Sequence, residues 1–211
     1  SGKRMITNIV FMGMGEPLLN YTNVLKAINL LTDDLAFGLA RRRVTVSTSG
    51  IIPEIDRLKD DTNVSLAISL HASNNDLRNS IVPINRSYPL IDLLAACKRF
   101  SEGRDDDAVT IEYVMLNGVN DSAQDARDLV KCLQGLPSKV NLIPFNKFPG
   151  TNYTCSDMNT INAFRDILMK AGIFTITRKT RGDDIDAACG QLVGKVASKA
   201  ARHQKRQAET I

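Results

Sequence analysis

A regular alternation of two patterns runs through the chain and limits it to the α/β class. Short apolar or β-branched runs predict strands, and the segments between them carry apolar residues at helical spacing. The predicted strands are Ile6–Gly13, Arg43–Thr48, Val64–Leu70, Val109–Leu116, Lys139–Phe145 and Ile173–Thr177.

Amphipathic segments between the strands predict helices. They are Thr22–Leu35, Pro53–Leu58, Asp76–Ile81, Leu90–Phe100, Ser122–Leu133 and Asn159–Lys170, followed by a basic helix from about residue 185 to 211. Strands that alternate with helices pair in parallel through right-handed crossovers. Six predicted strands do not close an eight-stranded barrel, so we expect either a partial barrel or an open doubly wound sheet.

Composition narrows the class of protein. Hydrophobic residues make up 43% of the 211 residues, enough to bury a substantial core. No apolar run approaches the roughly 20 residues of a membrane span, so we expect no membrane partner. The net charge of +4 is only weak support for a nucleic-acid partner. The cysteines lack metal-site spacing, which favours a reducing, cytoplasmic setting, and they are Cys97, Cys132, Cys155 and Cys189.

Small polar residues gather at the carboxyl ends of the predicted strands, where parallel α/β folds bind ligands. They include Gly13, Gly15, Glu16, Ser47–Gly50, Ser69–His71, Asn117 and Asn146. This set suits a zwitterionic, ribose-bearing small molecule better than a bare phosphate. Taken singly, each has a structural alternative, because glycines form turns, serines cap helices and a lone histidine often lies in a core. Their convergence at one end of the sheet favours a binding site.

A single cysteine near the end of the chain indicates a thiol site. Cys189 stands among small residues, after the basic stretch Arg178–Arg181 and two adjacent carboxylates. An inert buried thiol is the alternative for such a residue.

Five stretches, in the same order, resemble the RlmN/Cfr family of radical S-adenosylmethionine RNA methyltransferases. They are Met12–Pro17, Val44–Gly50, Ala67–Ala72, Asn141–Asn146 and Lys179–Gln191, and the resemblance runs from about Ile6 to Val196. It implies a TIM-like (β/α)6 partial barrel that lacks its first βα unit here. Residues 1–211 would then form one radical SAM core domain, incomplete at its N-terminus, with the basic helix from about residue 185.

The sequence departs from the family pattern in one important way. Family members carry an upstream CxxxCxxC loop for a 4Fe–4S cluster, a second essential cysteine and an accessory RNA-binding domain, and this sequence contains none of them. We therefore expect a C-terminal portion of the enzyme, with no metal ligands of its own and inactive by itself.

The resemblance also assigns roles to individual residues. Cys189 matches the cysteine that is methylated during turnover. The matches to S-adenosylmethionine contacts are Gly15, Glu16, Ser47, Ser69, Leu70, His71 and Asn146. Glu16 would hold the cofactor's ammonium group, since a carboxylate forms a charge-assisted hydrogen bond with it.

The implied activity is methylation of C2 of adenine in 23S ribosomal RNA and tRNA. C2 is electron-poor and cannot attack a methyl group, whereas a thiolate can. In the implied route one S-adenosylmethionine methylates Cys189. A second is reduced by the cluster to a 5′-deoxyadenosyl radical, which takes hydrogen from the methylated cysteine, and the resulting carbon radical adds to C2.

Three alternatives remain at this point. One is a Cfr-like methylation of adenine C8 on a similar scaffold. Another is a noncatalytic fragment, because the cluster cysteines are absent. A generic aldolase-like barrel is the third, and it lacks a Schiff-base lysine at any predicted strand end.

The resemblance finally implies partners. They are 23S rRNA and tRNA, with a reductant such as flavodoxin, and the complete enzyme would be a cytoplasmic monomer. Arg41–Arg43, Arg178–Arg181 and the basic tail would then contact RNA phosphates. A solvated surface is the alternative for the same charges.

Overall fold

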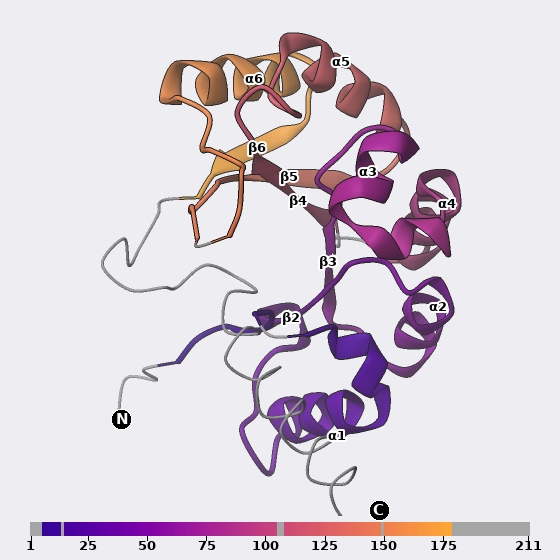
Figure 1. The fold of residues 1–211 in the computed structure, drawn as a ribbon. Coiled ribbons are helices and arrows are strands. Elements are labelled where there is room, and N and C mark those ends of the chain that lie inside the picture. Colours follow the sequence, from indigo (N-terminus) through magenta and orange to yellow (C-terminus); the bar gives the residue numbers. More distant parts are fainter. Residues whose placement is uncertain (1–5, 14, 105–107, 149, 179–211) are drawn as a thin grey trace, which may run out of the picture.

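The computed structural model describes residues 6–13, 15–104, 108–148 and 150–178. Within these residues one parallel sheet has its strands in the order in which they occur along the chain (Figure 1). The strands are β1 (Ile9–Phe11), β2 (Val44–Thr48), β3 (Ser65–Ser69), β4 (Val109–Met115), β5 (Ser138–Pro144) and β6 (Phe174–Thr177). The predicted alternation of strands and helices is confirmed, whereas the basic helix expected from about residue 185 lies outside the described residues.

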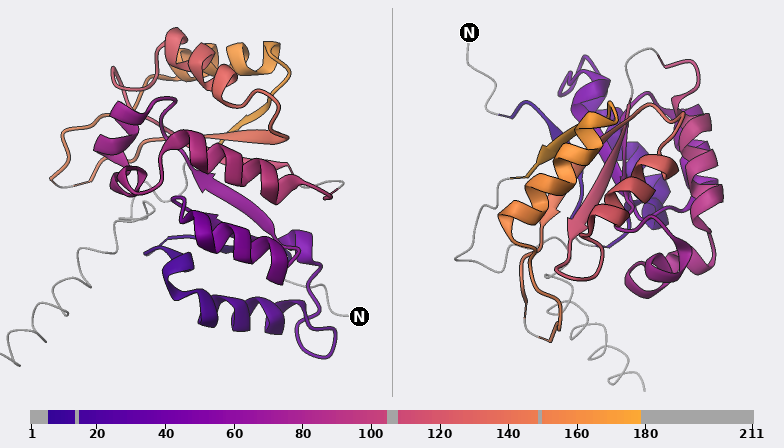
Figure 2. Two further views of the ribbon diagram at one scale, coloured as in Figure 1. Left: turned by 90° about the vertical axis from the view of Figure 1, so that its right-hand side faces the viewer. Right: turned by 90° about the horizontal axis from the view of Figure 1, so that it is seen from above.

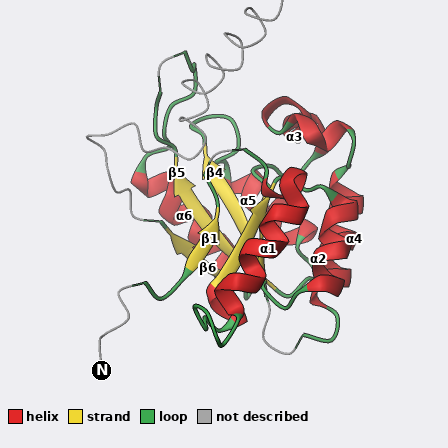
Figure 3. Cartoon of the chain, turned by 90° about the horizontal axis from the view of Figure 1, so that it is seen from below, coloured by secondary structure: helices red, strands yellow, loops and turns green. Residues whose placement is uncertain are grey.

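The helices lie along one side of the sheet. They are α1 (Tyr21–Thr32), α2 (Ile52–Asp61), α3 (Asn75–Ile81), α4 (Leu90–Ser101), α5 (Ala123–Cys132) and α6 (Met158–Lys170), with 3-10 turns η1 (Pro17–Asn20), η2 (Arg41–Arg43) and η3 (Pro83–Arg86). Sequential strand order with right-handed crossovers puts every helix on the same face, as Figures 2 and 3 show. This arrangement is a partial TIM-like barrel and excludes the doubly wound alternative. In the described part of the chain no helix is long and apolar enough to cross a membrane.

The hydrophobic core fills the space between the sheet and the helices. Alternate strand residues face the helices, and among them Val46, Ile68 and Ile111 are fully buried in one cluster with Leu58 and Phe164. Each such side chain stabilises the fold by about 1.5–3 kcal/mol relative to an exposed one.

The opposite, inner face of the sheet is more polar. Ser69, Glu112 and Asn141 are register partners across β3, β4 and β5. Since a strand's alternate side chains point to the same face, these three lie in one row on the inner side. The polar row predisposes this face to bind a ligand rather than to pack against another layer.

The first strand is shorter than predicted. The apolar run Ile6–Gly13 forms only three register pairs, Ile9 to Phe11 with Val44 to Val46. Gly13, with φ +131, leaves the extended conformation. Among the described residues β1 pairs only with β2, so nothing on its other side extends the ladder.

The first helix also ends earlier than predicted. Apolar spacing predicted a helix to Leu35, but Asp33 takes an extended conformation and ends α1 at Thr32. The Asp33 carboxylate accepts the N–H of Leu35 at 2.8 Å, and Leu35 is 98% exposed. A hydrogen bond from a side chain to a nearby main-chain N–H competes with the hydrogen bonds of a helix, and here it ends α1.

The two edge strands approach each other at their carboxyl ends. The Arg178 N–H donates to the Leu142 carbonyl at 2.8 Å and so extends the β5–β6 pairing. Its Nη1 lies 4.0 Å from the sulfur of Met12, which follows β1. The sheet therefore curves enough to bring the residues after β1 and β6 together.

The turn after β2 depends on a glycine, which gives a stability test. Gly50 has φ +112, and a Cβ added there would lie 2.9 Å from Leu93 Cδ1. We expect Gly50→Ala to lower the free energy of unfolding by about 2–4 kcal/mol, from overpacking and backbone strain together. Gly103→Ala is the control, because Gly103 has φ +76 but open space around it, and should cost about 1 kcal/mol. Equal losses in urea titrations of the two variants would contradict the role of the Leu93 contact.

Candidate functional site

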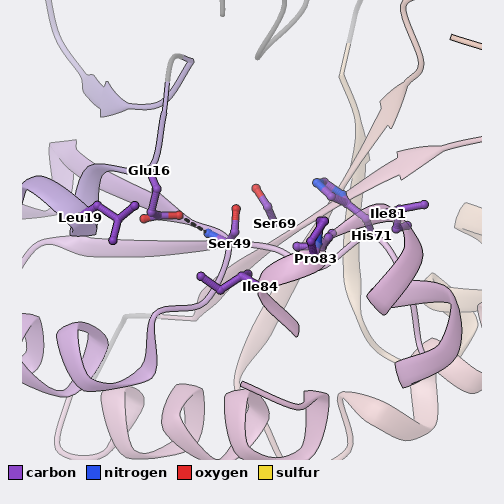
Figure 4. A pocket seen from close by; sticks show the side chains of 9 residues that line it. Glu16, Leu19, Ser49, Ser69, His71, Ile81, Pro83 and Ile84 are labelled. Atoms are coloured by element: carbon purple, nitrogen blue, oxygen red, sulfur yellow. Dashed lines mark hydrogen bonds between the residues drawn. The ribbon is translucent and has the colours of Figure 1, made fainter. Parts of the chain in front are cut away.

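A pocket of about 370 Å³ opens at the carboxyl ends of β1, β2 and β3. In Figure 4, Glu16 lies at one end and His71 at the other, with Ser49 and Ser69 between them. The rest of the lining is apolar and consists of Leu19, Ile81, Val82, Pro83 and Ile84. A few convergent polar groups beside an apolar wall are typical of small-molecule sites.

Glu16 is held in place by main-chain N–H groups from two segments, the turn η1 and the loop after β2. Gly15, with φ +73, turns the chain out of the preceding loop at no steric cost. Glu16 then caps η1, where Oε1 accepts the Leu18 N–H at 3.1 Å, and Oε2 accepts the Ser49 N–H at 2.7 Å. Because a carboxylate has about four acceptor positions, Glu16 can still accept from a ligand ammonium group.

His71 is fixed in an unusual backbone conformation and in one protonation state. It is the one non-glycine residue with positive φ (+63) in the described part of the chain. Its Nδ1 accepts the Val114 N–H at 3.2 Å, and its carbonyl accepts from Asn120 Nδ2 at 2.9 Å. Burial first, and then the charge of Arg78, lower the pKa of His71 from 6.5 to about 4. At neutral pH the ring is therefore uncharged, and its Nε2–H is the donor left for a ligand.

Ser47 lies below the pocket rather than in its lining. Its hydroxyl donates to Glu112 Oε2 at 3.2 Å, and both residues are buried. Burial raises the pKa of Glu112, opposed by the Ser47 hydrogen bond, the charge of Arg178 and a hydrogen bond with Asn141. The predicted cofactor contact of Ser47 would thus be shared with a neighbouring acid.

The remaining predicted residues take different positions. The Leu70 side chain is buried in the core, and its N–H donates to the Glu112 carbonyl at 3.0 Å. Asn146 follows β5, is half-buried and is not part of the pocket lining. Cys189 lies outside the described residues. The pocket therefore brings together Glu16, Ser69 and His71 from the predicted set.

Several residues that line the pocket or support it were not predicted. The wall Ile81–Ile84 is a short apolar run that joins the end of α3 to the start of η3. An apolar run in a segment that connects two short helices is a signal that could have been used. Glu112 is an acid in the middle of an otherwise apolar strand, which is a signal that could have been used. Arg78 had no such signal, because an arginine on a short helix is usually solvated.

The described residues offer no metal site. No three His, Cys, Asp or Glu side chains in ranges 6–13, 15–104, 108–148 and 150–178 lie together as metal ligands. Cys97 is buried, Cys132 is half-buried and donates to the Ser73 carbonyl at 3.1 Å, and Cys155 is exposed. These three thiols do not form a cluster-binding group.

A parallel partial barrel with a ligand pocket at its strand ends defines a class of α/β enzyme folds, and comparison identifies the family. The model of the radical SAM superfamily matches residues 1–130. The chain belongs to this superfamily. Membership implies S-adenosylmethionine and an iron–sulfur cluster as cofactors.

Two solved structures resemble the chain. A radical SAM methyltransferase from Sphaerobacter thermophilus has 48% sequence identity and a TM-score of 0.84, over 89% of this chain and 55% of that one. A domain of pyruvate-formate lyase-activating enzyme from Bacteroides vulgatus ATCC 8482 shares the fold, with 16% identity and a TM-score of 0.63 over 82% of this chain and 100% of that one. The chain thus spans little more than half the length of the methyltransferase.

The two implied cofactors fit the described residues differently. The pocket has an oriented carboxylate, a neutral imidazole donor and an apolar wall. These groups match an ammonium, a hydroxyl-bearing sugar and a purine face. The described residues, by contrast, supply no ligand set for a cluster. The described pocket residues therefore fit the chemistry of S-adenosylmethionine, and the described part of the chain supplies no ligands for the cluster.

The lowered pKa of His71 predicts a pH dependence of stability. Between about pH 6.5 and 4, His71 is protonated in the unfolded state and neutral in the folded state. Lowering the pH through this window therefore lowers the free energy of unfolding. We expect His71 to contribute up to about 3 kcal/mol to this loss. His71→Asn, which tolerates positive φ, should flatten the pH dependence of the unfolding free energy measured by urea titration. A slope equal to that of the wild type would contradict the neutral state of the half-buried His71.

Proposed function

We propose that this chain forms the cofactor-binding part of a radical SAM methyltransferase that methylates C2 of adenine in 23S rRNA and tRNA. The observation that carries the proposal is the 48% identity to a radical SAM methyltransferase, combined with a pocket at the strand ends. The order of five sequence stretches that resemble the RlmN/Cfr family supports the choice of RNA and of C2.

In this proposal the chain's own residues bind and orient S-adenosylmethionine. Glu16 accepts hydrogen bonds from the ammonium group, because its carboxylate is already aligned by Leu18 and Ser49. His71 donates from Nε2 to an oxygen of the cofactor. The wall Ile81–Ile84 packs on the purine and excludes water. Gly15, Ser47, Leu70 and Asn146 are proposed as further contacts on the strength of the resemblance.

Cys189 is proposed as the thiol that receives a methyl group. S-adenosylmethionine supplies that group when bound, and sulfur is a better nucleophile than C2 of adenine. The basic residues Arg41–Arg43 are proposed contacts for RNA phosphates, since they form η2 on the surface and are exposed.

The proposed activity is tested in a chimaera. In it the chain replaces the matching part of the Sphaerobacter thermophilus methyltransferase, and the rest of that enzyme is retained. We expect the cluster-loaded chimaera to produce 2-methyladenosine in 23S rRNA and in tRNA, measured by mass spectrometry of nucleosides. Cys189→Ala should abolish product, whereas Cys155→Ala, at an exposed thiol, should retain it.

The outcomes separate the alternatives. If the product is 8-methyladenosine, the position of methylation is C8 of adenine and the proposed C2 is wrong. A folded chimaera that makes neither product, while the intact Sphaerobacter enzyme is active on its own substrate, would favour the noncatalytic reading of this chain.

The role of Glu16 is tested by binding. Glu16→Gln puts an amide NH₂ against one of two main-chain N–H donors and removes the charge that faces the ammonium group. We expect affinity for S-adenosylmethionine to fall by about 1.5–3 kcal/mol, measured by NMR titration of this chain. Glu102→Gln is the control, because the Glu102 side chain is 71% exposed. An unchanged dissociation constant in Glu16→Gln would remove Glu16 from the site.

A further inference from the structure

Arg78 is a fully buried arginine beneath the pocket. It lies on α3, and its guanidinium donates four hydrogen bonds to neutral acceptors. They are Nε to the Leu70 carbonyl at 3.1 Å, Nη1 to Asn85 Oδ1 at 2.7 Å, and Nη2 to the Ser49 and Ser69 carbonyls at 2.6 and 3.3 Å. Among the described residues no carboxylate forms an ion pair with it.

These bonds connect the polar side of the pocket. The Ser49 N–H donates to the Glu16 carboxylate, and the Ser49 carbonyl accepts from the Arg78 guanidinium, so Ser49 joins the two charged groups. The Ser69 and Leu70 carbonyls immediately precede His71, which has φ +63. Fixing both carbonyls restrains the turn that points His71 into the pocket.

Arg78 also supports the apolar wall. Asn85, its side-chain acceptor, is buried and donates to the side-chain oxygens of Asn75 and Asn79 at 3.0 and 2.7 Å. The Val82 N–H donates to the Arg78 carbonyl at 2.7 Å. The end of α3 and the start of η3, which carry the wall, are therefore attached to the same residue: Val82 to its main chain and Asn85 to its guanidinium.

We propose that Arg78 is the positioning residue of this pocket: through Ser49 it sets Glu16, through Ser69 and Leu70 it sets His71, and through Asn85 it sets the apolar wall. Arg78 is not part of the pocket lining, and it acts through these groups. The inference rests on the proposed function in so far as S-adenosylmethionine is the ligand used to test it.

The chemistry of the site explains why arginine is needed. A planar guanidinium offers five donors in a fixed fork, whereas a lysine offers three donors at a single point. Burying a cation without an anion is costly unless its donors are all occupied by good acceptors. Lysine would keep the charge and lose the simultaneous bonds to β2, β3 and Asn85.

The first measurement needs no variant and no ligand. In the wild-type chain, the Nε–H and Nη–H groups of Arg78 should exchange with solvent far more slowly than those of exposed Arg86, as followed by NMR. Exchange of Arg78 at the rate of Arg86 would overturn the proposal, because the four bonds would then not persist in solution.

The second measurement uses Arg78→Lys and Arg78→Ala, with Arg86→Ala as the matched control on the same segment. We expect the Arg78 variants to speed amide exchange at Ser49 and to raise the dissociation constant for S-adenosylmethionine about 10- to 100-fold. Arg78→Ala should also raise the pKa of His71, and Arg78→Lys should not. Added ethylguanidinium, which replaces the missing atoms of Arg78→Ala, should restore part of the affinity.

The outcomes are distinguishable from a failure of the proposed function. If the wild-type chain does not bind S-adenosylmethionine, the cofactor assignment is wrong. The amide exchange of Ser49 and the pKa of His71 in the Arg78 variants then still test the positioning role of Arg78. If wild type binds, and folded Arg78→Lys binds equally well with unchanged Ser49 exchange, the positioning role is wrong. If the Arg78 variants do not fold, the wild-type exchange rates decide.

Discussion

The site depends on how the main-chain groups at the ends of β2 and β3 find partners. Buried N–H and C=O groups must be hydrogen-bonded. Where a strand ends beneath a pocket, several of its main-chain groups have no partner on a neighbouring strand. Here the Ser49 N–H is taken by Glu16, at 2.7 Å, and the Ser49 and Ser69 carbonyls are taken by Arg78. The same bonds that satisfy the backbone therefore align the acid at one end of the pocket. Stability and ligand recognition share one network.

Much of the fold could be predicted because burial dictates the spacing of apolar residues. β4 and β5 end only one residue earlier than the sequence pattern indicated. The pattern located them closely because a long apolar run such as Val109–Met115 forms a strand of the buried core. β1 and α1 were predicted to be too long, because the apolar pattern continues beyond the hydrogen-bonded residues of each element. Gly13 does not keep the extended conformation of β1. After α1, the Asp33 carboxylate accepts the Leu35 N–H, which a longer helix would have used. The alternation alone could not separate a partial barrel from a doubly wound sheet, because the two differ only in strand order. The family resemblance predicted the partial barrel, and the sequential strand order confirms it.

The candidate site was predicted only as far as strand ends could be located. Glu16, Ser69 and His71 follow directly from the rule that ligands bind at the carboxyl ends of parallel strands, and all three line the pocket. The partners of these residues could not be predicted, because they are set by tertiary contacts. Ser47 pairs with Glu112 from β4, which is 65 residues away in the sequence. Arg78 reaches back to Ser49 across 29 residues.

The distribution of charge makes the pocket polar along its length. Glu16 places a carboxylate at one end, whereas His71 at the other end is neutral. Behind the serines lies the positive charge of Arg78, which is buried and so only weakly screened by solvent. A ligand with an ammonium group near Glu16 and a carboxylate toward the serines would be attracted at both positions. An uncharged nucleoside would gain from the wall and from the His71 donor but from neither charge, because neither charge has a counterpart on it. The electrostatics of the pocket therefore favour an amino-acid moiety joined to an apolar base, and the cofactor proposed for this chain combines the two.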